Sequence, residues 1–100
     1  MEMINRAEID GKFIKNEAEF YKRLAEQIDF GVGYGYNLYA FRDRLECDLE
    51  RPVEIVWKNH DISKKLMGKD YELIIKVMSD IQEDDKLFYP EGKRFVYLLE

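Results

Sequence analysis

Carboxylates are the only potentially catalytic side chains that this sequence supplies in number. It contains two serines, no threonine, one cysteine (Cys47) and one histidine (His60), and these form no cluster along the chain. A base-activated nucleophile and a cysteine–histidine metal site are therefore both disfavoured. Two acids could hydrolyse a glycosidic bond, but that reaction needs a cleft with a defined carboxyl separation, and such enzymes are usually larger. The sequence indicates a protein that is not an enzyme and needs no metal or cofactor.

Acidic residues gather in the last third of the chain. Asp80 and Asp84 lie four residues apart near the end of a predicted helix, together with Glu83 and Asp85. Like charges at this spacing repel each other by roughly a few tenths of a kcal/mol, and the C-terminal end of a helix is already negative. An arrangement that lowers helix stability without a local gain indicates a binding surface. The alternative is an ordinary solvated acidic turn.

A loop rich in glycine and tyrosine precedes another predicted helix. Residues 31–43 have the sequence Gly-Val-Gly-Tyr-Gly-Tyr-Asn-Leu-Tyr-Ala-Phe-Arg-Asp. The glycines allow turns that other residues rarely adopt, and Tyr34 and Tyr36 offer rigid aromatic surface. Asn37 is expected to accept a hydrogen bond from a free amide of the following helix, which fixes how the loop meets that helix. The pattern indicates a loop exposed for contact on a stiff support.

Two other interpretations apply to this loop. Tyr34, Tyr36 and Tyr39 could be packing aromatics whose hydroxyl groups reach water. The glycines could also suggest a phosphate-binding loop. That second interpretation is disfavoured, because the glycines follow a predicted helix, whereas a dinucleotide site follows a strand and has a different spacing.

The length and composition are typical of one globular domain. With 100 residues, of which 46% are hydrophobic, the chain can build one core, so we expect a single domain over residues 1–100. The formal net charge of −5 disfavours nucleic acid and anionic membranes and favours a basic protein partner. Cys47 can form no internal disulfide, and we find no secretory signal and no apolar stretch of the roughly 20 residues that span a bilayer. We expect a cytoplasmic protein.

Alternating strand and helix patterns predict a parallel sheet with helical crossovers. The expected strands are residues 3–9, 52–57 and 95–99, and the expected helices are residues 16–28, 38–45, 61–67 and a longer helix capped by Asp70. The second strand is β-branched and opens with a proline, which indicates the central strand.

Several single residues have expected structural roles. Asn16 begins a sequence typical of a capping box. Trp57 is expected in the core, and His60 as a local cap or surface residue. Residues 83–93 contain turn formers and charges, and are expected to form a turn region.

The loop and helix sequence resembles the segment with which the barstar family of intracellular ribonuclease inhibitors enters its target. The matching pattern is Tyr34-Gly35-x-Asn37-Leu38-x-Ala40-Phe41-x-Asp43. Further matching features extend without gaps to about Asp84, at Ile9-Asp10-Gly11, Phe20, Leu24, Pro52, residues 54–57 and residues 63–66. The resemblance implies a barstar-like α/β fold, with a three-stranded parallel sheet packed with about four helices.

The resemblance also implies a function. Members of this family block a basic, barnase-type ribonuclease by inserting the loop and the second helix into its active site, without catalysis or cofactor. Asp43 matches the acidic position at the centre of that contact, and Asp80 and Asp84 match acidic positions on the last helix. The implied partner-binding residues are Gly33, Tyr34, Gly35, Tyr36, Tyr39, Arg42, Asp43, Asp80 and Asp84. The implied state of the free protein is a monomer.

The sequence departs from the family pattern at several contact positions. Tyr39 stands where a second contact carboxylate is usual, and Gly33 replaces an aromatic residue. Arg42 and Asp48 replace tryptophans, and Arg42 beside Asp43 opposes binding to a strongly basic cleft. The alternative is therefore a barstar-fold interaction module with a different protein partner and no ribonuclease inhibition. The chain also has an inserted loop at residues 85–93, which adds either a contact or nothing.

Overall fold

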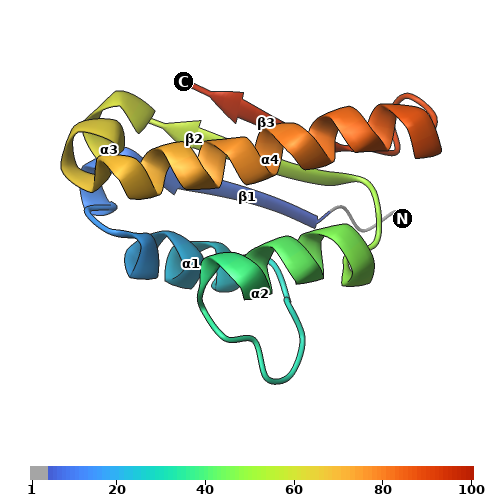
Figure 1. Ribbon diagram of the computed structural model, residues 1–100, viewed down its shortest axis with the longest axis horizontal. Coiled ribbons are helices and arrows are strands. Elements are labelled where there is room, and N and C mark those ends of the chain that lie inside the picture. Colours follow the sequence, from blue (N-terminus) through green and yellow to red (C-terminus); the bar gives the residue numbers. More distant parts are fainter. Residues whose placement is uncertain (1–4) are drawn as a thin grey trace.

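The computed structural model describes residues 5–100 and shows an α/β fold built on one three-stranded parallel sheet (Figure 1). The strands are β1 (Asn5–Asp10), β2 (Val53–Lys58) and β3 (Phe95–Leu99). The helices are α1 (Glu17–Ala25), α2 (Leu38–Asp43), α3 (His60–Met67) and α4 (Lys69–Phe88). A short 3-10 turn (Gly11–Phe13) follows β1, and a π-helical segment (Arg44–Asp48) continues α2. The predicted fold is confirmed; the first two residues of the predicted first strand lie outside the described residues.

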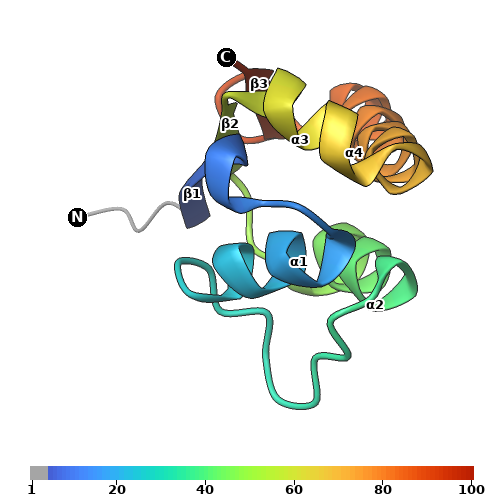
Figure 2. The ribbon, with the colours of Figure 1, turned by 90° about the vertical axis from the view of Figure 1, so that its left-hand side faces the viewer.

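The strand order is β1-β2-β3, so β2 is the central strand, as predicted. In the parallel register Ile55 of β2 lies between Ala7 and Tyr97. The connection from β1 to β2 and the one from β2 to β3 each lead to the next strand in the same direction along the sheet. The helices lie on one side of the sheet (Figure 2). One face of the sheet is therefore free of helices, and α1, α2 and α4 share the other.

An aromatic cluster joins the helices to the sheet. The ring of Phe20 in α1 lies 4.8 Å from Trp57 in β2 and 5.5 Å from Phe41 in α2, measured between ring centres. All three side chains are fully buried, which confirms the core position predicted for Trp57. The indole N–H of Trp57 donates to Ser63 Oγ at 3.3 Å, and this hydroxyl donates to the Gly11 carbonyl at 3.1 Å. Phe41 thus fixes α2 against α1 and the sheet.

The helix ends agree only in part with the sequence expectations. Asn16 caps α1, because its Oδ1 accepts from the Glu19 amide at 2.9 Å, but the helix ends at Ala25 and not at residue 28. The predicted cap at Asp70 is wrong: α4 begins at Lys69, directly after a glycine with a positive φ of 58°.

The residue His60 is the first of α3 and is half-buried. Its Nδ1 lies 2.7 Å from the hydroxyl oxygen of Tyr71 in α4. His60 therefore links α3 to α4, a contact that its expected role as a local cap or surface residue does not include.

The prediction of a turn region at residues 83–93 is wrong in its first half. Helix α4 continues to Phe88, so its acidic residues lie within the helix and not at its end. The run before Pro90 contains no helix breaker, and Asp85 is buried against Arg51 of the preceding connection. Helix propensity and one tertiary contact therefore extend α4 into the inserted segment, leaving only a short turn before β3.

Candidate functional site

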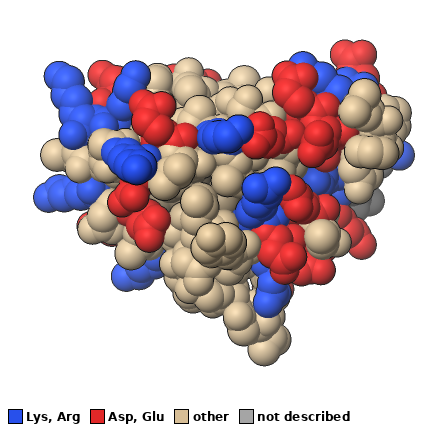
Figure 3. Space-filling model, viewed as in Figure 1, with Lys and Arg blue, Asp and Glu red and all other residues tan. Residues whose placement is uncertain are grey.

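The candidate site lies on the face of the molecule where α2 and α4 pack against each other. Figure 1 shows these helices in front of the sheet, and the loop of residues 29–37 protruding from the body between α1 and α2. Figure 3 shows acidic side chains gathered over the C-terminal half of α4 and below it, whereas the tip of the loop is largely uncharged. The site therefore combines an uncharged protrusion with an acidic surface.

The loop is held in place by Arg44 of the π-helical segment. The guanidinium donates to the carbonyl oxygens of Phe30 at 2.6 Å and Val32 at 3.0 Å. Gly31 has a positive φ of 90°, and a Cβ at this position would lie 2.6 Å from Arg44 Nη1. Gly33 also has a positive φ, of 78°. The glycines thus allow the backbone to approach an arginine that the sequence analysis overlooked.

The three tyrosines of the loop and helix have different environments. Tyr34 is buried, with 9% of its surface exposed, and its ring stacks on Phe30 at 4.6 Å between centres. Tyr36 is 50% exposed and packs against Tyr34, whereas Tyr39 on α2 is 88% exposed. Tyr34 therefore fits the packing interpretation, and Tyr36 and Tyr39 are the side chains available to a partner.

Asn37 connects the loop to α2 as predicted. Its Oδ1 accepts from the Ala40 amide at 2.9 Å, and its Nδ2 donates to the Gly35 carbonyl at 3.2 Å. A Cβ at Gly35 would lie 2.9 Å from this Nδ2, so only glycine leaves room for the contact. The cap therefore fixes the direction in which α2 leaves the loop.

The acidic residues of the site differ in whether a cation neutralises them. Asp80 pairs with Lys76 at 3.2 Å. Asp43 and Asp84 are exposed, and neither has an ion pair within residues 5–100. Of the three predicted site carboxylates, Asp43 and Asp84 are thus the two without an ion pair in the described part of the chain.

Arg42 is engaged by an acid that the sequence analysis did not select. Its Nε lies 3.2 Å from Glu46 Oε1, one turn further along. This exposed pair partly compensates the positive charge of Arg42 within the chain. The four-residue spacing of Arg42 and Glu46 is the signal that could have identified the pair in the sequence.

A groove of about 210 Å³ separates the π-helical segment from α4. It is lined by Glu46, Arg51, Ile81, Asp84, Asp85, Phe88 and Tyr89. The structure thus brings Asp84 of α4 to the same groove as Glu46, which follows Asp43 by three residues. Asp43 itself is not among the lining residues of the groove.

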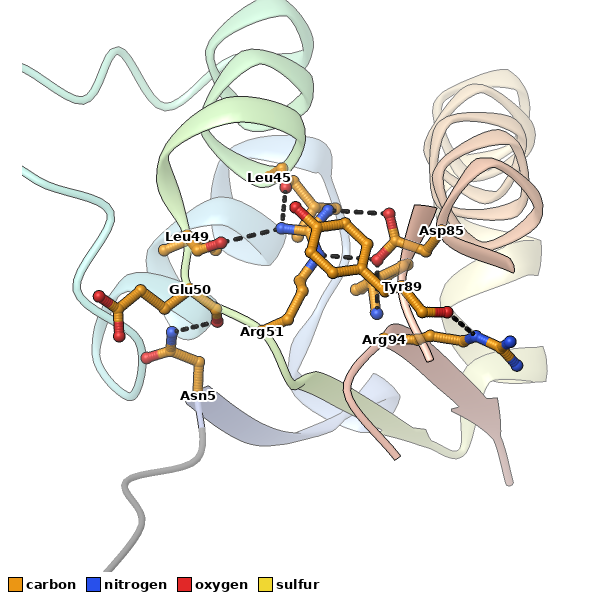
Figure 4. A network of polar contacts seen from close by, with 9 residues as sticks. Asn5, Leu45, Leu49, Glu50, Arg51, Asp85, Tyr89 and Arg94 are labelled. Atoms are coloured by element: carbon orange, nitrogen blue, oxygen red, sulfur yellow. Dashed lines mark hydrogen bonds and ion pairs between the residues drawn. The ribbon is translucent and has the colours of Figure 1, made fainter. Parts of the chain in front are cut away.

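The floor of this groove is a buried ion pair (Figure 4). Arg51 Nε and Nη2 donate to the two carboxylate oxygens of Asp85 at 2.7 and 3.1 Å, and both side chains are at least 95% buried. Arg51 Nη1 also donates to the carbonyl oxygens of Leu45 at 2.7 Å and Leu49 at 2.9 Å. Asp85 in turn accepts from the Phe95 amide at 2.7 Å. The pair joins the end of the π-helical segment to α4 and to β3.

The sequence does not reveal this pair. It places Asp85 in the acidic run interpreted as a binding surface or, alternatively, as a solvated turn, and it assigns no role to Arg51. A bidentate arginine–carboxylate contact is strong where its remaining polar atoms are also hydrogen-bonded, and here each guanidinium nitrogen and both carboxylate oxygens have a partner. The ring of Tyr89 also covers the Arg51 guanidinium, 5.2 Å away.

Neither a metal-binding group of side chains nor a membrane-spanning helix is found among the described residues. Within residues 5–100, no three His, Cys, Asp or Glu side chains form a group that could hold a metal ion. In the same part of the chain, every helix is too short or too polar to cross a bilayer.

Comparison with known proteins identifies relatives. Residues 4–100 match the family model described as "Barstar (barnase inhibitor)". The chain is also 31% identical over 78 residues to the Bacillus subtilis (strain 168) protein named "Putative ribonuclease inhibitor YrdF". That match covers 78% of this chain and 86% of the Bacillus protein.

Replacing Arg51 should destabilise the fold severely. Arg51→Ala leaves the buried Asp85 carboxylate without its cation, so we expect the free energy of unfolding to fall by about 3–5 kcal/mol. Arg42→Ala is the matched control, because its exposed pair with Glu46 should contribute less than about 1 kcal/mol. Urea denaturation followed by circular dichroism measures both. A similar small loss for the two variants would contradict the role assigned to Arg51.

The buried tyrosines should make the protein sensitive to alkali. Burial raises the pKa of Tyr34 and Tyr21, and neither hydroxyl has a hydrogen-bond partner among the described residues. The unfolded chain therefore releases these protons first. Stability should be retained below about pH 9 and fall above about pH 10, by about 1.4 kcal/mol per pH unit for each tyrosine.

Tyr34→Phe tests this expectation. The variant should be about as stable as the parent near pH 7, because no hydrogen bond is lost, and should lose less stability at about pH 11. Urea denaturation at the two pH values measures the difference. An identical alkaline loss in parent and variant would show that Tyr34 ionises as freely in the folded state as in the unfolded state.

Proposed function

Because this chain belongs to the barstar family, we propose that it is a protein inhibitor that binds a barnase-type ribonuclease and occludes its active site. Asp43 carries the proposal. It is exposed at the end of α2, and no cation within the described residues neutralises it. The family description and the printed name of the Bacillus relative both support ribonuclease as the target.

Electrostatics support a basic target. A ribonuclease binds RNA phosphates, so its cleft is lined with cations that a carboxylate can contact in their place. Asp43 and Asp84 project from neighbouring helices of a chain with a net charge of −5. This field attracts a basic cleft and speeds encounter, and the bound carboxylates then exclude RNA. No bond is made or broken, so the protein itself need not be an enzyme.

The exposed aromatics support a contact with the rim of such a cleft. Tyr36 and Tyr39 are held by the Asn37 cap and by α2, so few rotamers are lost when a partner covers them. Gly33 and Gly35 contribute through the loop shape, and Tyr34 through its packing under Tyr36. The predicted set of partner-binding residues therefore divides into exposed contacts and residues that hold them.

The alternative is a barstar-fold module with another protein partner. Tyr39 favours it, because this position lacks the second carboxylate that the family pattern has. The Arg42–Glu46 pair weakens the other argument for it, since the charge of Arg42 is compensated within the chain. We retain the inhibitor as the main proposal.

We further propose that the protein acts as a cytoplasmic monomer. Its single cysteine, Cys47, is an exposed free thiol, which suits a reducing compartment.

Removal of the Asp43 carboxylate should weaken binding to barnase. We expect Asp43→Ala to lose about 2–5 kcal/mol of binding free energy, the range for truncating one partner of a buried charge pair, for which the barnase–barstar complex is itself a reference case. Isothermal titration calorimetry measures the loss. Asp61→Ala, which removes the same charge from exposed α3, should bind as the parent does. Equal affinities of all three proteins would exclude Asp43 as the anchor.

Salt should separate the two candidate functions. If the acidic surface steers a basic ribonuclease, raising ionic strength from about 50 to about 500 mM should lower the association rate constant about tenfold or more, with a much smaller change in dissociation. Surface plasmon resonance against barnase gives both rate constants. An association rate that is insensitive to salt would favour the alternative, a partner recognised without charge.

A further inference from the structure

Two large apolar side chains are exposed at the end of α4. Leu87 is 79% exposed and Phe88 is 77% exposed, so neither side chain contributes to the core. Neither residue is part of the aromatic cluster around Phe20. Both lie in the inserted segment, residues 85–93, where the sequence departs from the family pattern.

Phe88 belongs to the acidic groove, and Leu87 does not. Phe88 follows Asp84 by one helical turn, and both line the groove together with Glu46. Leu87 is not among the lining residues, because successive residues of a helix point about 100° apart. The phenyl ring of Phe88 therefore lies one helical turn beyond Asp84, which has no ion pair among the described residues, at one end of the acidic surface.

The contacts on both sides of Phe88 fix the backbone from which its exposed ring projects. Three residues earlier, Asp85 is bound to Arg51, and the following Tyr89 lies against the Arg51 guanidinium. The Tyr89 amide donates to the Asp85 carbonyl at 2.9 Å, and its carbonyl accepts from Arg94 Nε at 2.8 Å. The last turn of α4 is thus fixed at its side chains and its backbone, so a partner would order little when it covers Phe88.

We propose that Phe88 is an apolar anchor for the same basic ribonuclease, and that the binding surface extends along α4 beyond Asp84 to this ring. This proposal rests on the function proposed above and adds a contact to it. Phe88 would pack against the aliphatic stem and guanidinium of an arginine on the ribonuclease whose charge Asp84 attracts, since Glu46 is already paired with Arg42. Charge complementarity selects this occupant, because the ring stands in a groove whose exposed charges are acidic. Aromatic residues, Phe included, are enriched in protein–protein interfaces relative to the rest of the surface.

The test compares Phe88→Ala with Leu87→Ala. Both variants lose an apolar side chain of similar exposure from adjacent positions, so their urea midpoints should match that of the parent. Against barnase in isothermal titration calorimetry, Phe88→Ala should weaken the dissociation constant about tenfold or more, and Leu87→Ala less than about threefold. Surface plasmon resonance should assign the loss of Phe88→Ala to faster dissociation, since no charge is removed.

Two results would overturn the anchor. One is a Phe88→Ala affinity within about threefold of the parent while Asp43→Ala still weakens binding by the loss expected above, which would leave the proposed inhibitor function standing. The other is an equal loss in Leu87→Ala, which would indicate general apolar contact and not a residue of the groove. Absence of binding by the parent protein would instead contradict the proposed function, and the anchor with it.

Discussion

The buried pair of Arg51 and Asp85 is the interaction on which the candidate surface depends. It lies where the end of the π-helical segment, α4 and β3 meet, and the guanidinium has four acceptor atoms within hydrogen-bonding distance. Such a pair is costly to bury unless its polar atoms are hydrogen-bonded, and here each guanidinium nitrogen and both carboxylate oxygens have a partner. Because Arg51 binds Asp85 of α4 and the carbonyl oxygens of Leu45 and Leu49, the pair joins α4 to the end of the π-helical segment.

A second arginine has the same role for the loop. Arg44 binds two carbonyl oxygens of the loop, and the glycine at position 31 leaves space for it. Together with the Asn37 cap, this contact anchors the loop of residues 29–37 to α2 and to the π-helical segment. A surface that is ordered before binding loses less conformational entropy in the complex. The contacts of Arg44 and Asn37 thus order the loop, and the contact of Arg51 with Asp85 orders the end of α4, before a partner binds.

The sequence predicted the elements better than the contacts between them. Periodicity and capping residues gave the parallel sheet, the central strand and the caps at Asn16 and Asn37, because these signals are local. The pair of Arg51 and Asp85 spans 34 residues, and nothing local distinguishes Asp85 from its solvated acidic neighbours. The same limit applies to the site, since the resemblance selected Asp43 and Asp84 but only geometry separates them from the neutralised Asp80.

We propose that this protein blocks a ribonuclease by occupying its active site. Titrating the protein into barnase while following RNA cleavage tests this proposal. If the account is right, cleavage falls in proportion to the protein added and ends at a one-to-one ratio, because one monomer closes one active site. Undiminished cleavage in the presence of a large molar excess would contradict it.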